Sequence, residues 1–172
     1  MELNLTLLNP LDNLVIDYRN EVINDITANK QDEHYLSWFG PNWDKQNFLY
    51  ADGVTDIDGN LISLSASEIT HNGLRLKVTC RMYVISKFRS TYQSINQQLI
   101  IPKYVEIANQ LNIPTLWYTV HAFNKRLERY ANSVVRHVSH TDNSLMPYYN
   151  QIYYDGIVDY KGVQQHSFLL DL

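Results

Sequence analysis

The chain has 172 residues, of which 45% are hydrophobic and 19% charged, as expected for one globular domain over residues 1–172. The formal net charge of −4 predicts no general basic surface for nucleic acid or for an anionic membrane. Cys80 is the single cysteine, which excludes an intramolecular disulfide and a cysteine-based zinc site. We find no apolar run long enough to cross a membrane and no signal-peptide pattern, so we expect a cytoplasmic protein.

The N-terminal third predicts a strand, a helix and a loop. Leu3–Leu8 reads as a strand, and Pro10-Leu11-Asp12 is a plausible start for a helix. The helix then carries apolar residues at helical spacing: Leu14, Val15, Tyr18, Val22, Ile23 and Ile26. Residues 29–47 are polar and aromatic, with Trp38 and Trp43, and we expect a loop there.

Three antiparallel strands are expected next. The first two span about Phe48–Thr55 and Leu61–Thr70, and Asp58-Gly59 forms the turn between them. Asn72-Gly73 turns the chain into a third strand, which extends from Leu74 to Ile85. Its apolar residues alternate strictly, so we expect a central strand with one buried face: Leu74, Leu76, Val78, Cys80, Met82 and Val84. A buried, unreactive thiol is expected at Cys80.

The second half predicts a helix interrupted or started at Pro102, within a helical pattern from Ile95 to Leu111. After it we expect a strand, a basic helix and a hairpin, over Thr115–Val120, Asn124–His137 and Gln151–Leu170. This order predicts an α+β fold in three layers. Its central sheet is mixed and mostly antiparallel, with helices on both faces.

A polar turn follows the third strand at Ser86-Lys87-Phe88-Arg89-Ser90-Thr91-Tyr92. Where a strand ends in such a turn and a helix begins, unpaired amides and the positive end of the helix dipole can hold a phosphate. Arg89 would then face the anion. The alternative is that Arg89 is only a surface residue of the turn.

Three local features, in their order along the chain, resemble the GNAT superfamily of N-acyltransferases, which use acyl-coenzyme A. Asp56–Ile62 is similar to the turn between that family's second and third strands. Val84–Arg89 is similar to its strand-end pattern of valine, an apolar residue, proline, two residues and arginine, with Ser86 in place of the proline. Val120–Asn124 resembles the end of its fifth strand and the asparagine that opens its fourth helix. The resemblance extends from Leu3 to Leu170.

The sequence also departs from that family at three positions. The small residues of the phosphate loop are replaced by Tyr92 and Ser94. Ala131 stands where the family often has a tyrosine, and the nearest tyrosine is Tyr130. Two alternatives to an acyl-CoA enzyme therefore stay open: a non-catalytic GNAT-like binding module, and an acyltransferase that uses an acyl-carrier protein.

The resemblance implies acetyl-CoA or another acyl-CoA as cosubstrate, bound between the fourth and fifth strands. Backbone groups of Met82 and Val84 would pair with the pantetheine. The amides of the turn would receive the pyrophosphate, with residues Arg89, Ser90, Thr91, Tyr92, Gln93 and Ser94. Asn124 would hydrogen-bond the cofactor, and Arg129 would meet phosphate charge. For Asn124 the structural alternative is a helix N-cap.

Transfer to an amine requires a base for the ammonium and an acid for the leaving thiolate. Glu68 is the first candidate for the base, His121 is the second, and Tyr130 is the candidate acid. Each has a structural alternative, an exposed strand residue for Glu68 and a core tyrosine for Tyr130. We expect no metal, since His137 and His140 have no carboxylate set near them in sequence.

The acceptor implied by the resemblance is an amine of a small molecule or peptide. It would enter near the first helix, the loop after it and the final hairpin, where the candidate lining residues are Tyr18, Arg19, Trp38, Trp43, Tyr153 and Tyr154. Aromatic walls favour a flat, apolar or cationic amine. The alternative is that Trp38 and Trp43 only pack the loop onto the domain. The sequence leaves the oligomeric state open, a homodimer included.

Overall fold

The computed structural model describes residues 2–92, 95–121, 148 and 151–172. The chain divides into two compact units. The N-terminal unit consists of Met1–Glu68 and Thr79–Gln93, and the C-terminal unit of Ile69–Val78 and Ser94–Leu172. The single domain expected from the sequence stays a prediction.

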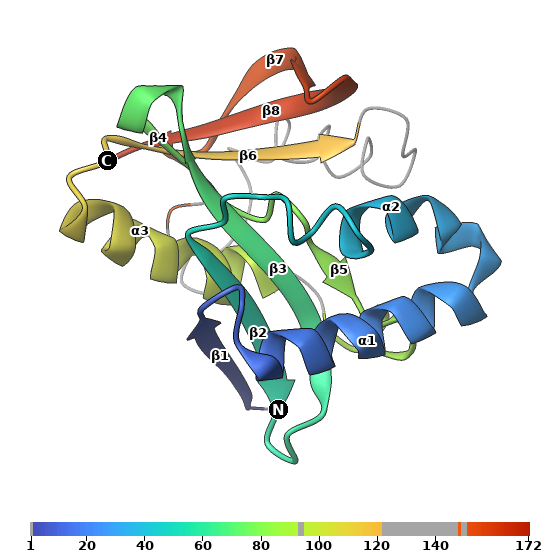
Figure 1. The fold of residues 1–172 in the computed structure, drawn as a ribbon. Coiled ribbons are helices and arrows are strands. Elements are labelled where there is room, and N and C mark those ends of the chain that lie inside the picture. The colour runs from blue at the N-terminus through green and yellow to red at the C-terminus, as the bar shows by residue number, and fades with distance from the viewer. Residues whose placement is uncertain (1, 93–94, 122–147, 149–150) are drawn as a thin grey trace. The chain divides into compact units, whose positions relative to one another are not determined.

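The N-terminal unit contains an antiparallel sheet in the order β1-β2-β3, with a short strand, β5, pairing with β3 (Figure 1). The bounds of these strands are β1 Leu3–Leu8, β2 Tyr50–Asp56, β3 Leu61–Thr70 and β5 Tyr83–Val84. The turn between β2 and β3 contains Gly59 at a φ of +83°. This is the left-handed conformation that Asp-Gly predicts, so the first two strands of the predicted meander are confirmed.

One long helix, α1 (Asn13–Ala28), lies along this sheet in Figure 1. Val15, Val22 and Ile26 form its buried stripe, while the expected core residue Leu14 is 43% exposed. Gly53 of β2 allows close contact, because a β-carbon there would lie 2.5 Å from the Tyr18 ring.

The segment after α1 is not only a loop, as the sequence analysis expected. It contains a short 3₁₀ helix, Lys30–Tyr35, and one helical turn, α2 (Leu36–Phe39). Both pack aromatic side chains on the core, and this tertiary packing supports helices too short to predict from their own propensity.

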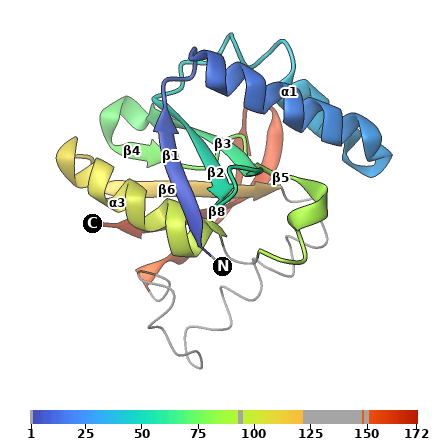
Figure 2. The same ribbon diagram turned by 90° about the horizontal axis from the view of Figure 1, so that it is seen from below.

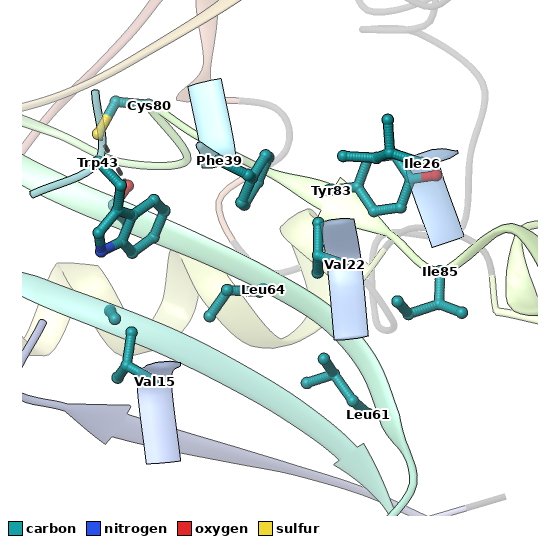
Figure 3. Close-up of a cluster of buried hydrophobic side chains, with 12 residues drawn as sticks. Val15, Val22, Ile26, Phe39, Trp43, Leu61, Leu64, Cys80, Tyr83 and Ile85 are labelled. Atoms are coloured by element: carbon teal, nitrogen blue, oxygen red, sulfur yellow. Dashed lines mark hydrogen bonds between the residues drawn. The ribbon is translucent and has the colours of Figure 1, made fainter. Parts of the chain in front are cut away.

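The core of the N-terminal unit lies between α1, α2 and the sheet, as Figure 3 shows. Its buried side chains come from α1, α2, β2, β3, β5 and the segments beside them: Val15, Val22, Ile26, Phe39, Trp43, Ala51, Leu61, Leu64, Ala66, Cys80, Tyr83 and Ile85. Cys80 is buried and its thiol donates to the carbonyl of Ala66 at 3.0 Å, which confirms the expected buried thiol.

The predicted continuous strand from Leu74 to Ile85 is wrong. It is two short strands, β4 (Arg75–Lys77) and β5, and Thr79 between them has a φ of +53°. A β-branched residue in this region breaks the pleat, and sequence alternation does not reveal it.

The break reverses which residues face inward. Before it, Leu76 and Val78 are buried, as expected, whereas the expected core residue Leu74 is 60% exposed. After it, Tyr83 and Ile85 are buried, and the expected core residues Met82 and Val84 are only half-buried. A displacement of one residue exchanges the two faces of a strand, so a period-two pattern read through the break assigns the second half to the wrong face.

The C-terminal unit contains strands in the order β4-β6-β8-β7. β4 and β6 are parallel and the other pairs are antiparallel. The new strands are β6 Thr115–His121, β7 Tyr153–Tyr160 and β8 Val163–Asp171. Lys161 and Gly162 form the predicted hairpin turn, with φ values of +54° and +80°.

Helix α3 (Ile101–Gln110) lies beside β6 (Figure 2). It has Pro102 in its first turn, as predicted, and follows a π-helical turn at Asn96–Ile100. The predicted basic helix at residues 124–137 lies outside the described residues. None of the described helices is long and apolar enough to cross a membrane.

Candidate functional site

The backbone of β5 has one edge directed away from β3. Val84 lies opposite Ser63, and the neighbouring Ile85 N–H donates to the Ile62 carbonyl at 2.9 Å. Because backbone directions alternate along a strand, Val84 directs its N–H and C=O groups away from β3. This is the direction that the predicted pantetheine contact requires. Met82 lies before the start of β5, and its contact with the pantetheine stays a prediction.

Arg89, the predicted phosphate-facing residue, has partners within its own unit. One guanidinium nitrogen pairs with the Asp32 carboxylate at 2.8 Å, and Nε donates to the Val84 carbonyl at 3.0 Å. The guanidinium carbon also lies 4.8 Å from the centre of the Tyr83 ring. These contacts account for Arg89 as a structural residue, and its contact with phosphate stays a prediction.

Asp25, near the end of α1, anchors the turn after β5. Its carboxylate accepts hydrogen bonds from the Tyr83 hydroxyl, the Ser86 N–H and the Ser86 hydroxyl, each at 2.8 Å. Proline, the residue of the resembling family at this position, has no N–H to donate. Both donors of Ser86 are therefore satisfied by the Asp25 carboxylate on α1.

The hydroxyl of Tyr83 also donates to Asp32, at 3.1 Å, so this buried ring connects the two carboxylates. Burial, and then the hydrogen bond to Asp25, raises the pKa of Tyr83 far above its usual value of 10.0. The hydroxyl thus stays protonated and serves as a donor.

Most amides of the turn already have acceptors. The Arg89 N–H donates to the Ser86 carbonyl at 3.3 Å, and the Thr91 and Tyr92 N–H groups share the Phe88 carbonyl at 3.0 Å. Within the described part of the turn, the Lys87 and Ser90 N–H groups have no protein acceptor. Of the two, Ser90 lies in the stretch predicted to receive the pyrophosphate. Gln93 and Ser94 lie outside the described residues. Ser90 is therefore the best-supported amide for an anion.

The candidate catalytic residues are placed only in part. Glu68, in β3, is 8% exposed, so the alternative that it is an exposed strand residue is wrong. Alternation along β3 puts it on the same face as Leu64 and Ala66, which belong to the core under α1. His121 is the last residue of β6 and pairs with Gln165. Three candidates lie outside the described residues: Tyr130, Asn124 and Arg129.

The predicted acceptor-lining residues have different environments. Trp43 is 1% exposed and stacks on Phe39 with ring centroids 5.6 Å apart, so its assignment to a pocket wall was wrong. Trp38 is half-buried, and so is Tyr18. Arg19 pairs with Asp44 at 2.7 Å.

Two exposed tyrosines of β7 belong to the C-terminal unit. The hydroxyl of Tyr153 donates to the Asp171 carboxylate, and the hydroxyl of Tyr154 is 3.0 Å from Nδ1 of His166. Their predicted role in the acceptor pocket is untested.

Sequence reasoning missed Arg81, which lies in the bend between β4 and β5. One terminal guanidinium nitrogen donates to the carbonyl of Cys80 at 3.0 Å. Its Nε is buried and has no hydrogen-bond partner in the part of the chain that is described. The guanidinium carbon lies 5.6 Å from the centre of the Trp38 ring. Alternation placed Arg81 on a polar strand face, with no signal to distinguish it from Arg75.

Lys77 was also expected on the polar face, yet it is fully buried in the C-terminal unit. Its ammonium donates to the Thr119 hydroxyl at 2.6 Å and lies within 4.5 Å of the ring centres of Trp117 and Tyr160. Aromatic faces and a hydroxyl thus accompany this buried cation. Among the described residues there is no group of three or more His, Cys, Asp or Glu residues that could hold a metal ion.

No protein-family model and no curated protein matches this chain. Solved structures do match over its whole length. An acetyltransferase of the GNAT family from Staphylococcus aureus Mu50 has a TM-score of 0.62 and 11% identity, and the match covers 99% of both chains. An aminoglycoside acetyltransferase in complex with coenzyme A has a TM-score of 0.60 and 9% identity, with 99% of this chain and 95% of that chain covered.

A spermidine N-acetyltransferase chimera that includes the Vibrio cholerae protein has a TM-score of 0.56 and 13% identity, with 99% of this chain and 96% of that chain covered. At these identities the similarity defines the fold. The chain has the mixed, mostly antiparallel α+β fold of GNAT acetyltransferases, as predicted from the sequence.

Proposed function

We propose that this protein is an acyl-CoA-dependent N-acyltransferase, with acetyl-CoA as the favoured donor and an amine of a small molecule or peptide as the acceptor. The observation that carries the proposal is the match to acetyltransferase structures over 99% of the chain. One of those neighbours is a complex with coenzyme A, which supports an acyl-CoA donor. A fold hosts more than one activity, so the residues of the site must support the proposal as well.

The N-terminal unit contributes the expected donor groups. Bound acyl-CoA would supply an activated thioester carbonyl. Val84 has backbone groups directed away from β3 for pairing with the pantetheine, although its carbonyl already accepts a bond from Arg89. Met82, just before β5, is the second proposed contact. The Ser90 N–H has no protein acceptor among the described residues and would donate to a phosphate oxygen.

Glu68 remains our candidate for the base. In the proposed reaction it takes one proton from the acceptor ammonium, and the amine nitrogen bonds to the thioester carbon. The carbon–sulfur bond then breaks, and the nitrogen loses its second proton to solvent to give the amide. Tyr130 is proposed to return a proton to the thiolate. The burial of Glu68 favours proton transfer in a site with little water.

The test is release of free thiol from acetyl-CoA in the presence of a panel of amines. Replacing Glu68 with glutamine should lower kcat by about 10²–10⁴-fold, the usual contribution of a general base. It should leave acetyl-CoA affinity unchanged. Glu106→Gln, on the surface of α3, is the matched control and should keep wild-type rates. A wild-type protein that binds acetyl-CoA yet acylates no amine would contradict the proposal.

Two observations favour a second candidate, a GNAT-like module without acyl-CoA chemistry. Arg89 is bonded within its own unit, and Tyr92 replaces a small residue of the phosphate loop. Thermal melting with acetyl-CoA and longer acyl-CoAs separates the candidates, since a ligand at one hundred times its Kd stabilises by about 2.7 kcal/mol. No shift at millimolar acyl-CoA would favour the module. Acyl transfer from an acyl-carrier protein without such a shift would favour the third alternative.

A further inference from the structure

We infer that Arg81 and Trp38 form a subsite for an anionic group of the acceptor, so that the acceptor is an amino-acid-like amine that carries a carboxylate. This inference rests on the proposed acyltransferase function. Arg81 directly precedes Met82, whose backbone is proposed to meet the pantetheine near the thioester. A group held at Arg81 would therefore lie close to the reacting centre.

The hydrogen bonds of Arg81 are incomplete. A guanidinium has five N–H donors, and here one of its terminal nitrogens reaches the Cys80 carbonyl. The Nε is buried with no acceptor, and no carboxylate lies within ion-pair distance of Arg81 among the residues that the structure places. The two other arginines of this unit, Arg19 and Arg89, each have a carboxylate within 2.8 Å.

A buried donor without an acceptor indicates a missing partner. Buried polar groups in native proteins are almost always hydrogen-bonded, because their lost hydration is otherwise uncompensated. A carboxylate fits the side of a guanidinium with two parallel bonds, one of them to Nε. Such a ligand would therefore complete the bonding of Arg81.

Trp38 holds the guanidinium in place. The Arg81 guanidinium carbon lies 5.6 Å from the Trp38 ring centre, and Trp38 is in turn packed edge-to-face on Tyr35 with centroids 5.0 Å apart. Contact with an aromatic ring engages the guanidinium through the π-system and leaves its N–H donors available. Trp38 and Arg81 are both half-buried, so part of the pair is exposed, whereas Nε itself is buried and a carboxylate would reach it only with a shift of the side chains.

The subsite lies on the same face as the proposed base. Arg81 contacts Trp38, which packs against the core cluster under α1. Alternation along β3 puts Glu68 on that face as well. An α-amino acid has an ammonium for Glu68 and a carboxylate for Arg81. The aromatic residues alone predicted a flat, apolar or cationic amine. The arginine without a carboxylate partner adds a carboxylate to the proposed acceptor.

The test compares acceptors that differ by one carboxylate. A panel of α-amino acids is paired with the corresponding decarboxylated amines, and kcat/KM is measured for each with acetyl-CoA. Wild-type protein should prefer the carboxylate-bearing members by at least about tenfold. Arg81→Gln should reduce that ratio to about one, while rates with decarboxylated amines stay within about twofold. Arg75→Gln, an arginine that lies over Trp117, is the matched control and should keep the wild-type ratio.

A second measurement does not depend on turnover. Calorimetry measures binding of N-acetylated amino acids and of the N-acetylated amines that lack the carboxylate, to wild type and to Arg81→Gln. Tighter binding of the carboxylate members that is lost in the variant would support the subsite even if no acyl transfer occurs, which separates it from failure of the proposed function. Equal or weaker binding of the carboxylate members by wild type, or no binding of any member, would overturn it. An unchanged preference in a folded Arg81→Gln protein would also overturn it.

Discussion

Arg89 and Arg81 lie eight positions apart at the two ends of β5, and their environments are opposite. The guanidinium of Arg89 has a carboxylate, a backbone carbonyl and an aromatic ring as partners. Arg81 has an aromatic ring and one carbonyl, and its buried Nε has no acceptor in the described structure. The sequence pointed to Arg89 as a phosphate-binding residue, whereas Arg81 is the arginine of this unit that has no carboxylate partner among the described residues.

The difference shows that a charged residue at the expected place is not by itself available for a ligand. Arg89 stabilises the turn after β5 together with Asp25, Asp32 and Tyr83. Arg81 keeps donors that nothing in the described structure uses. Stability should therefore depend on the turn after β5, and acceptor choice on the bend before it.

Loss of Asp25 should give the largest effect on stability. Asp25→Ala removes the acceptor of three hydrogen bonds to Tyr83 and Ser86, and bonds to charged groups contribute about 1.5–3 kcal/mol each without full additivity. We expect the free energy of unfolding, measured in urea, to fall by about 3 kcal/mol. Asn24→Ala, at an exposed neighbouring position on α1, should change it by less than about 0.5 kcal/mol. Similar unfolding free energies for Asp25→Ala and Asn24→Ala would show that the hydrogen bonds of Asp25 do not stabilise the protein.

The next largest effect should be a difference in stability between variants of Arg89 and of Arg81. Arg89→Gln leaves the nearly buried Asp32 without its cation, and because the Arg89 side chain is 25% exposed we expect a loss of about 2 kcal/mol rather than the full effect of a buried pair. Arg81→Gln breaks no ion pair among the described residues and should lose less than about 1 kcal/mol. The same chemical change at both sites provides its own control. Equal losses of unfolding free energy in the two variants would show that the ion pair of Arg89 does not stabilise the protein more than the contacts of Arg81 do.

Ser86 tests why this chain lacks the proline of the resembling family. Ser86→Ala removes only the hydroxyl bond to Asp25, whereas Ser86→Pro also removes the N–H bond. Ile85 has an extended backbone with ψ at 130°, which proline tolerates in the preceding residue. We expect thermal melts to show losses of about 1 kcal/mol for alanine and about 2 kcal/mol for proline. A proline variant as stable as wild type would contradict the role of the Ser86 amide.

A smaller and pH-dependent effect is expected at the turn between β2 and β3. Hydrogen bonds from the Asn60 side chain, and then from the backbone N–H groups of Asn60 and Asp58, lower the pKa of Asp56 below its usual value. A carboxyl with a lowered folded-state pKa stabilises the protein above its unfolded-state pKa, and this is lost as the pH falls through the folded-state value. Asp56→Asn should therefore be less stable than wild type at neutral pH, and the gap should close in acid. A gap that is independent of pH would contradict this account.

The sequence predicted the fold well where local chemistry determines it. Turns such as Asp58-Gly59 and Lys161-Gly162 require positive φ, so these boundaries are encoded in a few neighbouring residues. Pro102 lies where the helix changes from a π-helical turn to α3, close to the interruption that this residue predicts. The break at Thr79 is different. Nothing near Thr79 in the sequence favours its left-handed backbone, which separates β4 from β5.

The candidate site was predicted less well, because it depends on partners that are distant in sequence. Asp25 is 61 residues from Ser86, and Trp38 is 43 residues from Arg81, so no local pattern connects them. Trp43 is part of the core because Phe39 stacks on it, although its loop sequence did not distinguish a core residue from a pocket wall. Motif positions selected a segment of the chain, and the packing shows which of its described groups already have partners.

Titration of the protein with acetyl-CoA in a calorimeter tests the proposed donor most directly. We expect saturable one-to-one binding with a Kd within about 1 μM–1 mM, the usual range of substrate affinities. Ser90→Pro, which lacks an N–H that has no protein acceptor among the described residues, should weaken binding by about tenfold or more if its circular dichroism spectrum is that of wild type. Ser90→Ala, which keeps that N–H, should bind like wild type. Absence of binding heat at millimolar acetyl-CoA, or equal affinity in the proline variant, would contradict the account.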